Sequence, residues 1–116
     1  MRDVLPEATE ALGALTGGLL ATFGGHGYRQ VTTPAFEYAE VLERGMSSID
    51  RAEQLRFFEP GTGELALLRP DMTPQIARIV ATRLAHLPAP WRLAYAGTVL
   101  RQRKGRARLG RQATQA

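Results

Sequence analysis

Residues 91–116 read WRLAYAGTVLRQRKGRARLGRQATQA, a pattern that predicts a strand, a loop and a returning strand. The first strand spans residues 91–103, a basic loop with glycine spans 104–110, and the second strand begins at residue 111. Successive side chains of a strand point to opposite faces. One face of the first strand therefore holds Leu93, Tyr95, Gly97, Val99, Arg101 and Arg103.

Arg101 is the residue of this hairpin with the clearest chemical use. On the predicted face it has small and apolar neighbours, and a planar guanidinium group there can bind a carboxylate or a phosphate through two hydrogen bonds. Gln115 lies on the returning strand and can point into the same space. The alternative is an edge hairpin with solvated arginines, which composition alone favours.

The segment LLRPDMT at residues 67–73 joins a predicted strand to a predicted helix. It contains Asp71, the only acidic residue of residues 67–116. A carboxylate at this junction can bind a cation such as an α-amino group. The sequence is equally compatible with a simpler role, in which Asp71 and Thr73 only cap the helix.

The N-terminal segment predicts a helix over residues 1–23. Pro6 and Glu7 suit its first turn, and the glycine-rich run 24–27 ends it. Gly17 and Gly18 each weaken the helix by roughly 1 kcal/mol, so packing must compensate. The predicted apolar stripe consists of Ala8, Leu12, Leu15, Leu19 and Phe23.

The middle of the chain predicts further elements around clear turn residues. Pro60-Gly61-Thr62-Gly63 separates two apolar runs and predicts a hairpin. The other predictions are a short strand over 29–33, a helix over 36–44, strands over 55–59 and 64–68, and a helix over 73–87 with Thr73 as its cap. This order predicts an α+β domain on a mostly antiparallel sheet.

Composition and charge limit the possible functions. The 116 residues fit one domain, and their net charge is −5 over residues 1–66 but +9 over residues 67–116. The basic part suits an anion or an acidic partner. With no Cys, and with His26 and His86 far apart, we expect no metal site, no cofactor and no catalytic nucleophile. We also expect no membrane span and a cytoplasmic protein.

Several segments together resemble the catalytic core of class II histidyl-tRNA synthetases and, more closely, their paralogue, the regulatory subunit of ATP phosphoribosyltransferase. The resemblance extends over essentially the whole chain. The segments that carry it are RDVLP at residues 2–6, TPAFE at 33–37, LRPDMTPQIAR at 68–78, LAYAGTVLR at 93–101 and GRQATQA at 110–116.

Two departures favour the regulatory paralogue over the synthetase. Synthetases carry Glu-Gly where this chain has Asp71-Met72, and motif 2 has a glutamate for the adenine amino group where this chain has Arg103. An arginine cannot accept a hydrogen bond from an amino group. The resemblance therefore argues against adenylate formation while leaving an amino-acid or anion site possible.

The resemblance implies a fold and a place in metabolism. The fold is a class II aminoacyl-tRNA synthetase-like antiparallel sheet flanked by helices, and residues 1–116 form the N-terminal part of the catalytic-core domain, ending within motif 2. The implied role is a non-catalytic regulatory subunit. Such a subunit assembles with the short-form catalytic subunit that joins ATP to phosphoribosyl pyrophosphate, and it transmits feedback inhibition by histidine.

The resemblance also implies roles for single residues. Asp71 would hold the α-amino group of histidine, with Thr73 in support. Arg101 would meet the carboxylate or a nearby anion, and Gln115 would line the pocket. We expect self-association besides the catalytic partner.

Two alternatives remain from the sequence. A divergent histidyl-tRNA synthetase would show histidine-dependent ATP–pyrophosphate exchange. An RNA-binding module would use the basic C-terminal residues, but these lack interleaved aromatic side chains, so nucleic acid is disfavoured.

Overall fold

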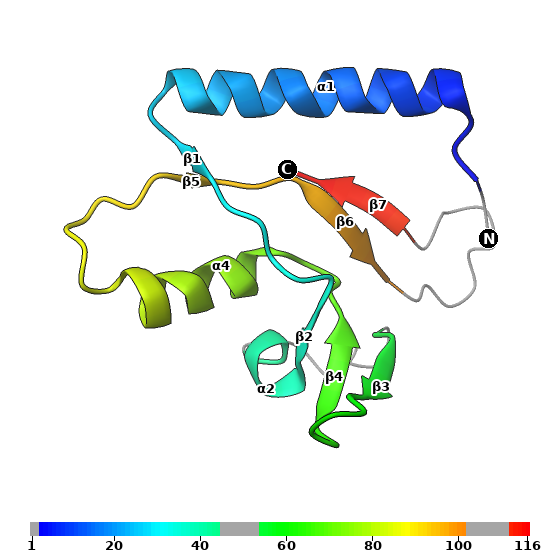
Figure 1. The fold of residues 1–116 in the computed structure, drawn as a ribbon, viewed down its shortest axis with the longest axis vertical. Helices are drawn as coiled ribbons and strands as arrows, with labels where there is room; N and C mark the ends of the chain where they lie inside the picture. Colours follow the sequence, from blue (N-terminus) through cyan, green and yellow to red (C-terminus); the bar gives the residue numbers. More distant parts are fainter. Residues whose placement is uncertain (1–2, 45–53, 102–111) are drawn as a thin grey trace.

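The computed structural model describes residues 3–44, 54–101 and 112–116. In it, one long helix lies beside three small sheets (Figure 1). The elements are α1 (Pro6–Gly25), β1 (Arg29–Gln30), β2 (Phe36–Tyr38), α2 (Ala39–Leu42), β3 (Arg56–Phe58), β4 (Leu65–Leu68), α4 (Thr73–Ile79), the π-helix η1 (Val80–Leu84), β5 (Leu93–Ala94), β6 (Gly97–Leu100) and β7 (Gln112–Gln115).

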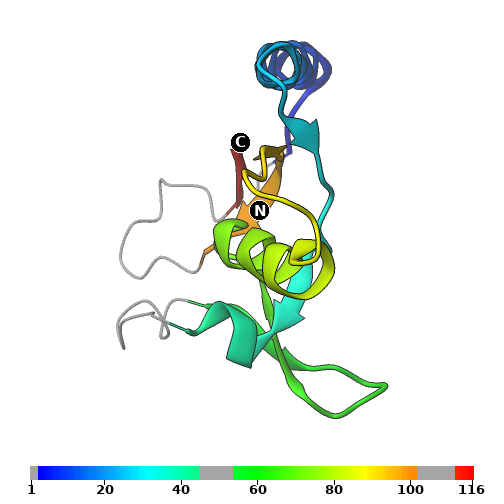
Figure 2. The same ribbon diagram turned by 90° about the vertical axis from the view of Figure 1, so that its left-hand side faces the viewer.

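Helix α1 confirms the prediction of an N-terminal helix. It begins at Pro6, ends at Gly25, and is followed by Gly27 with a φ of 81°. Figure 2 shows α1 at the edge of the molecule, next to β1, and none of its residues is buried within the described part of the chain. Phe23 of the apolar stripe is half-buried, with its ring 6.2 Å from that of Tyr28, whereas Leu15 is 62% exposed. No helix of the described ranges is long and apolar enough to cross a membrane.

Strands β2, β4 and β3 form an antiparallel sheet in that order. The β3–β4 pair confirms the predicted hairpin, with Phe58 opposite Leu65 and a positive φ at Gly63. The predicted helix over 36–44 is wrong in its first three residues, because Phe36–Tyr38 pairs with β4 and only Ala39–Leu42 is helical. Cross-strand pairing here overrides the helical pattern.

The predicted long strand over residues 91–103 is divided in two. β5 pairs in parallel with β1, whereas β6 pairs antiparallel with β7, with Gly97 opposite Gln115. The chain changes partners between β5 and β6, so one continuous ladder is impossible. β7 confirms the returning strand, while Arg103 and the basic loop lie outside the described residues.

The predicted helix over residues 73–87 is also shorter than expected. Its α-helical part ends at Ile79 and continues as the π-helix η1. The prediction of Thr73 as its cap is wrong, because Met72 holds the N-cap position and makes no side-chain capping bond.

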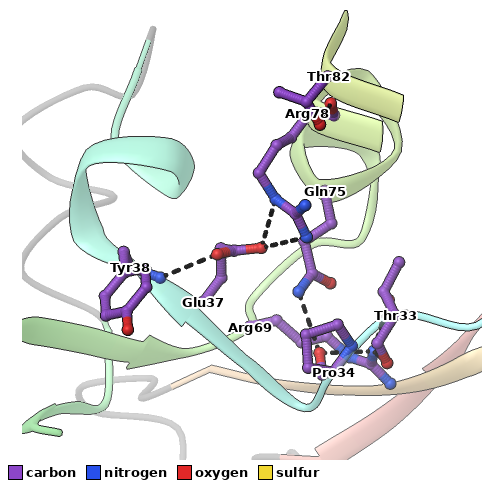
Figure 3. Close-up of polar contacts among 8 residues, drawn as sticks. All are labelled: Thr33, Pro34, Glu37, Tyr38, Arg69, Gln75, Arg78 and Thr82. Carbon is purple, nitrogen blue, oxygen red and sulfur yellow. Dashed lines mark hydrogen bonds and ion pairs between the residues drawn. The ribbon is translucent and has the colours of Figure 1, made fainter. Parts of the chain in front are cut away.

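Polar contacts fix α4 against β2 (Figure 3). Arg78 donates from Nε and Nη2 to Glu37 Oε2, both at 2.8 Å, and Glu37 Oε1 accepts from the Tyr38 backbone N–H. The fully buried Gln75 donates to the Pro34 carbonyl at 3.0 Å. Leu42, Leu67 and Ala39 form the apolar core beside these contacts. The start of α4, where Asp71 and Thr73 lie, is therefore held in place from the β2 side.

Candidate functional site

A buried arginine organises the loop that carries the candidate site. Arg69 is only 7% exposed and donates from Nη1 to Thr33 and to the Pro34 carbonyl, and from Nε to the Thr98 carbonyl at 2.7 Å. The backbone N–H of Arg69 donates to the Ala35 carbonyl, and the Arg69 carbonyl accepts from the Leu100 backbone N–H. One side chain thus joins β6 to residues 33–34, directly before the Pro70-Asp71 turn (Figure 3 shows part of this set).

Gly97 makes room for this arginine. A Cβ atom at Gly97 would lie 2.5 Å from Arg69 Nη2 and 3.0 Å from the sulfur of Met72, which is almost fully buried. The absence of a side chain at Gly97 is therefore what lets Arg69 and Met72 pack below β6.

We expect Gly97→Ala to lower the free energy of unfolding by about 1–3 kcal/mol, because the new methyl group overlaps Arg69 and Met72. Urea denaturation followed by circular dichroism measures this change. Gly13→Ala is the matched control, since nothing lies within 4 Å of a Cβ there and helix propensity favours alanine. Equal stability of the two variants would show that the packing below β6 is loose.

Asp71 and Gln115 meet across 44 positions of sequence. The Gln115 amide donates from Nε2 to Asp71 Oδ1 at 2.8 Å and accepts at Oε1 from the Met72 backbone N–H at 3.0 Å. Asp71 Oδ1 also accepts from the Thr73 backbone N–H at 2.9 Å. Both of these bonds end on Asp71 Oδ1.

Thr73 and Arg101 complete the set of four predicted site residues. The Thr73 hydroxyl lies 3.1 Å from the hydroxyl of Tyr95, and both groups are near the start of α4. Arg101 follows β6, is exposed, and donates from Nε to the Pro70 carbonyl at 2.9 Å. The structure thus brings Asp71, Thr73 and Gln115 into one hydrogen-bonded group. Arg101 lies beside this group, because it is bonded to Pro70, the residue before Asp71.

Electrostatics keep Asp71 ionised. Partial burial raises the pKa of the Asp71 carboxyl, but hydrogen bonds from the Thr73 backbone, the Gln115 amide and the Thr73 hydroxyl, with the positive charge of Arg101, more than offset it. The pKa of Asp71 therefore lies below its usual value, and the group is an anion at neutral pH. Burial also lowers the pKa of Arg69, which still carries its charge at that pH.

This arrangement suits a ligand with a cation and an anion on neighbouring atoms. An ammonium group has three donors, and Asp71, Thr73 and Tyr95 offer oxygens that can accept them. Arg101 supplies a positive group beside this acceptor set. No group of three or more His, Cys, Asp or Glu residues that could hold a metal ion gathers in the described ranges.

Sequence reasoning missed the contributions of Tyr95 and Arg69. Tyr95 lies on the same face of the predicted strand as Arg101. The alternation of side chains along that strand could therefore have indicated that Tyr95 belongs to the site. Arg69 adjoins the predicted loop, but a charged side chain is rarely buried, and its acceptors lie about 30 residues away in either direction. Asp71 does make the local contact expected of a helix-capping residue, and it contacts Gln115 as well.

Comparison with known proteins places the chain in a family. The family model described as histidyl-tRNA synthetase matches residues 1–116. The chain belongs to the histidyl-tRNA synthetase family. The resemblance inferred from the sequence is thereby confirmed.

Curated relatives within this family carry a regulatory name. A protein named ATP phosphoribosyltransferase regulatory subunit from Anaeromyxobacter dehalogenans is 46% identical over 116 residues, which is all of this chain and 33% of the relative. One of the same name from Paramagnetospirillum magneticum is 40% identical over all of this chain and 31% of the relative. The chain therefore spans about a third of the length of the curated relatives it matches.

Solved structures of the histidyl-tRNA synthetase family agree with the fold. An ATP phosphoribosyltransferase regulatory subunit/histidyl-tRNA synthetase from Bacillus halodurans superposes with a TM-score of 0.82 at 31% identity, over 98% of this chain and 29% of that one. Apo S. aureus histidyl-tRNA synthetase, at 22% identity and a TM-score of 0.74, shares the fold over 98% of this chain and 26% of that one. The predicted class II synthetase-like α+β fold is confirmed.

Proposed function

We propose that this chain belongs to a non-catalytic regulatory subunit of ATP phosphoribosyltransferase, and that its Asp71 site binds histidine as the feedback effector. The observation that carries the proposal is the ionised Asp71 in an acceptor group with Thr73 and Gln115, beside Arg101. An α-amino acid presents the complementary pair, an ammonium group next to a carboxylate.

Each end of histidine has a partner in this proposal. Asp71 and the Thr73 hydroxyl take the α-ammonium group, and charge-assisted hydrogen bonds make this the strongest contact. Arg101 takes the carboxylate, since its Nε is anchored to the Pro70 carbonyl, next to Asp71, and a guanidinium group has further donors that suit a carboxylate. Gln115 lines the pocket by holding Asp71 and the Met72 backbone together.

The regulatory role rests on the relatives and on two departures from the synthetase motifs. Relatives of 40–46% identity over the whole chain carry the regulatory name. Asp71-Met72 stands where synthetases carry Glu-Gly, and Arg103 stands where motif 2 has the glutamate for the adenine amino group. The partner is then the catalytic subunit of short-form ATP phosphoribosyltransferase, in a cytoplasmic hetero-oligomer whose regulatory subunits also self-associate.

The test is phosphoribosyl transfer by the purified short-form catalytic subunit, with and without this chain, over a histidine titration. We expect the chain to raise the rate and histidine to reverse the increase. A chain that is folded by circular dichroism but leaves the rate unchanged at every histidine concentration contradicts the proposal for these 116 residues. Histidine-dependent ATP–pyrophosphate exchange by the chain would instead establish the synthetase alternative.

A further inference from the structure

We infer that Tyr95 is a positioning residue of the amino-acid site: its hydroxyl group holds the Thr73 hydroxyl in the orientation that serves both Asp71 and a bound ammonium group. The inference rests on the proposed function for its ligand. The contact itself is a property of the unliganded chain, with 3.1 Å between the two hydroxyl oxygens.

The backbone on both sides of Tyr95 is fixed by different partners. β5, which ends at Ala94, pairs with β1, and β6, which begins at Gly97, pairs with β7. Tyr95 itself is half-buried, whereas Thr73 is exposed at the first position of α4. The better-anchored tyrosine can therefore restrain the more mobile hydroxyl of an exposed threonine.

Proton counting gives the direction of the hydrogen bonds. The Thr73 hydroxyl is one of the groups that lower the pKa of the Asp71 carboxyl, and an ionised carboxylate only accepts. The single Thr73 hydroxyl proton is thus directed to Asp71. Tyr95 must then donate its proton to Thr73 Oγ1, which makes a relay from Tyr95 through Thr73 to Asp71. Hydrogen bonds in such a chain polarise and strengthen one another.

The relay prepares the site for an ammonium group. With its proton directed to Asp71 and one lone pair occupied by Tyr95, the Thr73 oxygen keeps its second lone pair for the ligand. Without Tyr95, the Thr73 hydroxyl loses one of the contacts that orient it, and binding must supply that order. Tyr95 therefore acts through Thr73 on both the carboxylate and the ligand.

The test is Tyr95→Phe in the full 116-residue chain, which removes only the hydroxyl group. We expect histidine to bind about 5- to 10-fold more weakly by calorimetry, the effect of losing one neutral hydrogen bond. In the unliganded chain we expect the pKa of Asp71, followed by NMR of its side-chain carboxyl carbon, to rise, because the Thr73 hydroxyl is then less well oriented toward the ionised carboxylate. Arg101, the charged group that contributes to this pKa, is unchanged in both proteins.

Two controls separate positioning from a general effect on the fold. Tyr38→Phe removes the hydroxyl of another half-buried tyrosine, in β2, and should change neither quantity. In a Thr73→Val background, Tyr95→Phe should have no further effect on the Asp71 titration, because the relay is already broken.

An unchanged Asp71 titration in Tyr95→Phe, or an equal further shift in the Thr73→Val background, would overturn the inference. If wild type binds no histidine, the proposed function fails, and the titration of the unliganded chain still decides the relay. If wild type and Tyr95→Phe bind histidine equally, the proposed function survives and the positioning role is rejected.

Discussion

Arg69→Met is expected to lower the free energy of unfolding by about 3–5 kcal/mol, the largest stability change we predict. Methionine has a similar length but no donor, so the carbonyls of Thr33 and Thr98 lose the guanidinium that now bonds them, while the Pro34 carbonyl keeps its bond from Gln75. Each buried acceptor left without a partner costs about 1–3 kcal/mol, and removing the buried charge recovers part of that sum.

Chemical denaturation measures this change, with Arg83→Met as the matched control. Arg83 is exposed on η1, and its replacement should change the free energy of unfolding by no more than about 0.5 kcal/mol. Because a domain of this size has a total stability of only about 5–15 kcal/mol, Arg69→Met should also shift the thermal midpoint strongly. A loss below about 1 kcal/mol would mean that water replaces the guanidinium at no cost.

Asp71→Asn is expected to weaken histidine binding by about 30- to 150-fold, or about 2–3 kcal/mol. The substitution keeps an oxygen for the Thr73 backbone N–H and the Gln115 amide, so the loop stays in place while the negative charge is lost. The ammonium group then loses its charge-assisted partner.

The matched control is Asp3→Asn, at an exposed acidic residue that precedes α1. It changes the net charge equally but should leave histidine affinity unchanged. Calorimetric titration of both variants checks the prediction, and a comparable loss in the two would show that total charge, not the Asp71 site, attracts the ligand.

Local signals predicted those elements that depend on neighbouring residues. The turn residues 60–63 predicted the β3–β4 turn, in which Gly63 has a positive φ, and Pro6 lies in the first turn of α1 as expected, although the helix was predicted from residue 1. The errors occurred where distant strands compete for a segment. Phe36–Tyr38 becomes a strand because β4 lies beside it, and the long strand divides because β1 and β7 lie beside different halves.

The candidate site shows the same division. The strand–loop–strand pattern predicted that Arg101 and Gln115 lie in one hairpin. The position of Asp71 and Thr73 between a predicted strand and a predicted helix made them candidate site residues. Their meeting depends on contacts that no local pattern contains, such as the bridge from Gln115 to Asp71 and the bond from Thr73 to Tyr95. The buried guanidinium of Arg69 was unpredictable for the same reason.

The central claim is that Asp71 recognises the α-amino group of histidine. Its most direct test is calorimetric titration of the chain with histidine and with 3-(imidazol-4-yl)propionate, which lacks only that amino group. We predict that wild type binds histidine at least about 30-fold more tightly than the analogue, and that Asp71→Asn binds the two alike. Equal affinity of wild type for both compounds, or a preference for histidine that persists in Asp71→Asn, would contradict the claim.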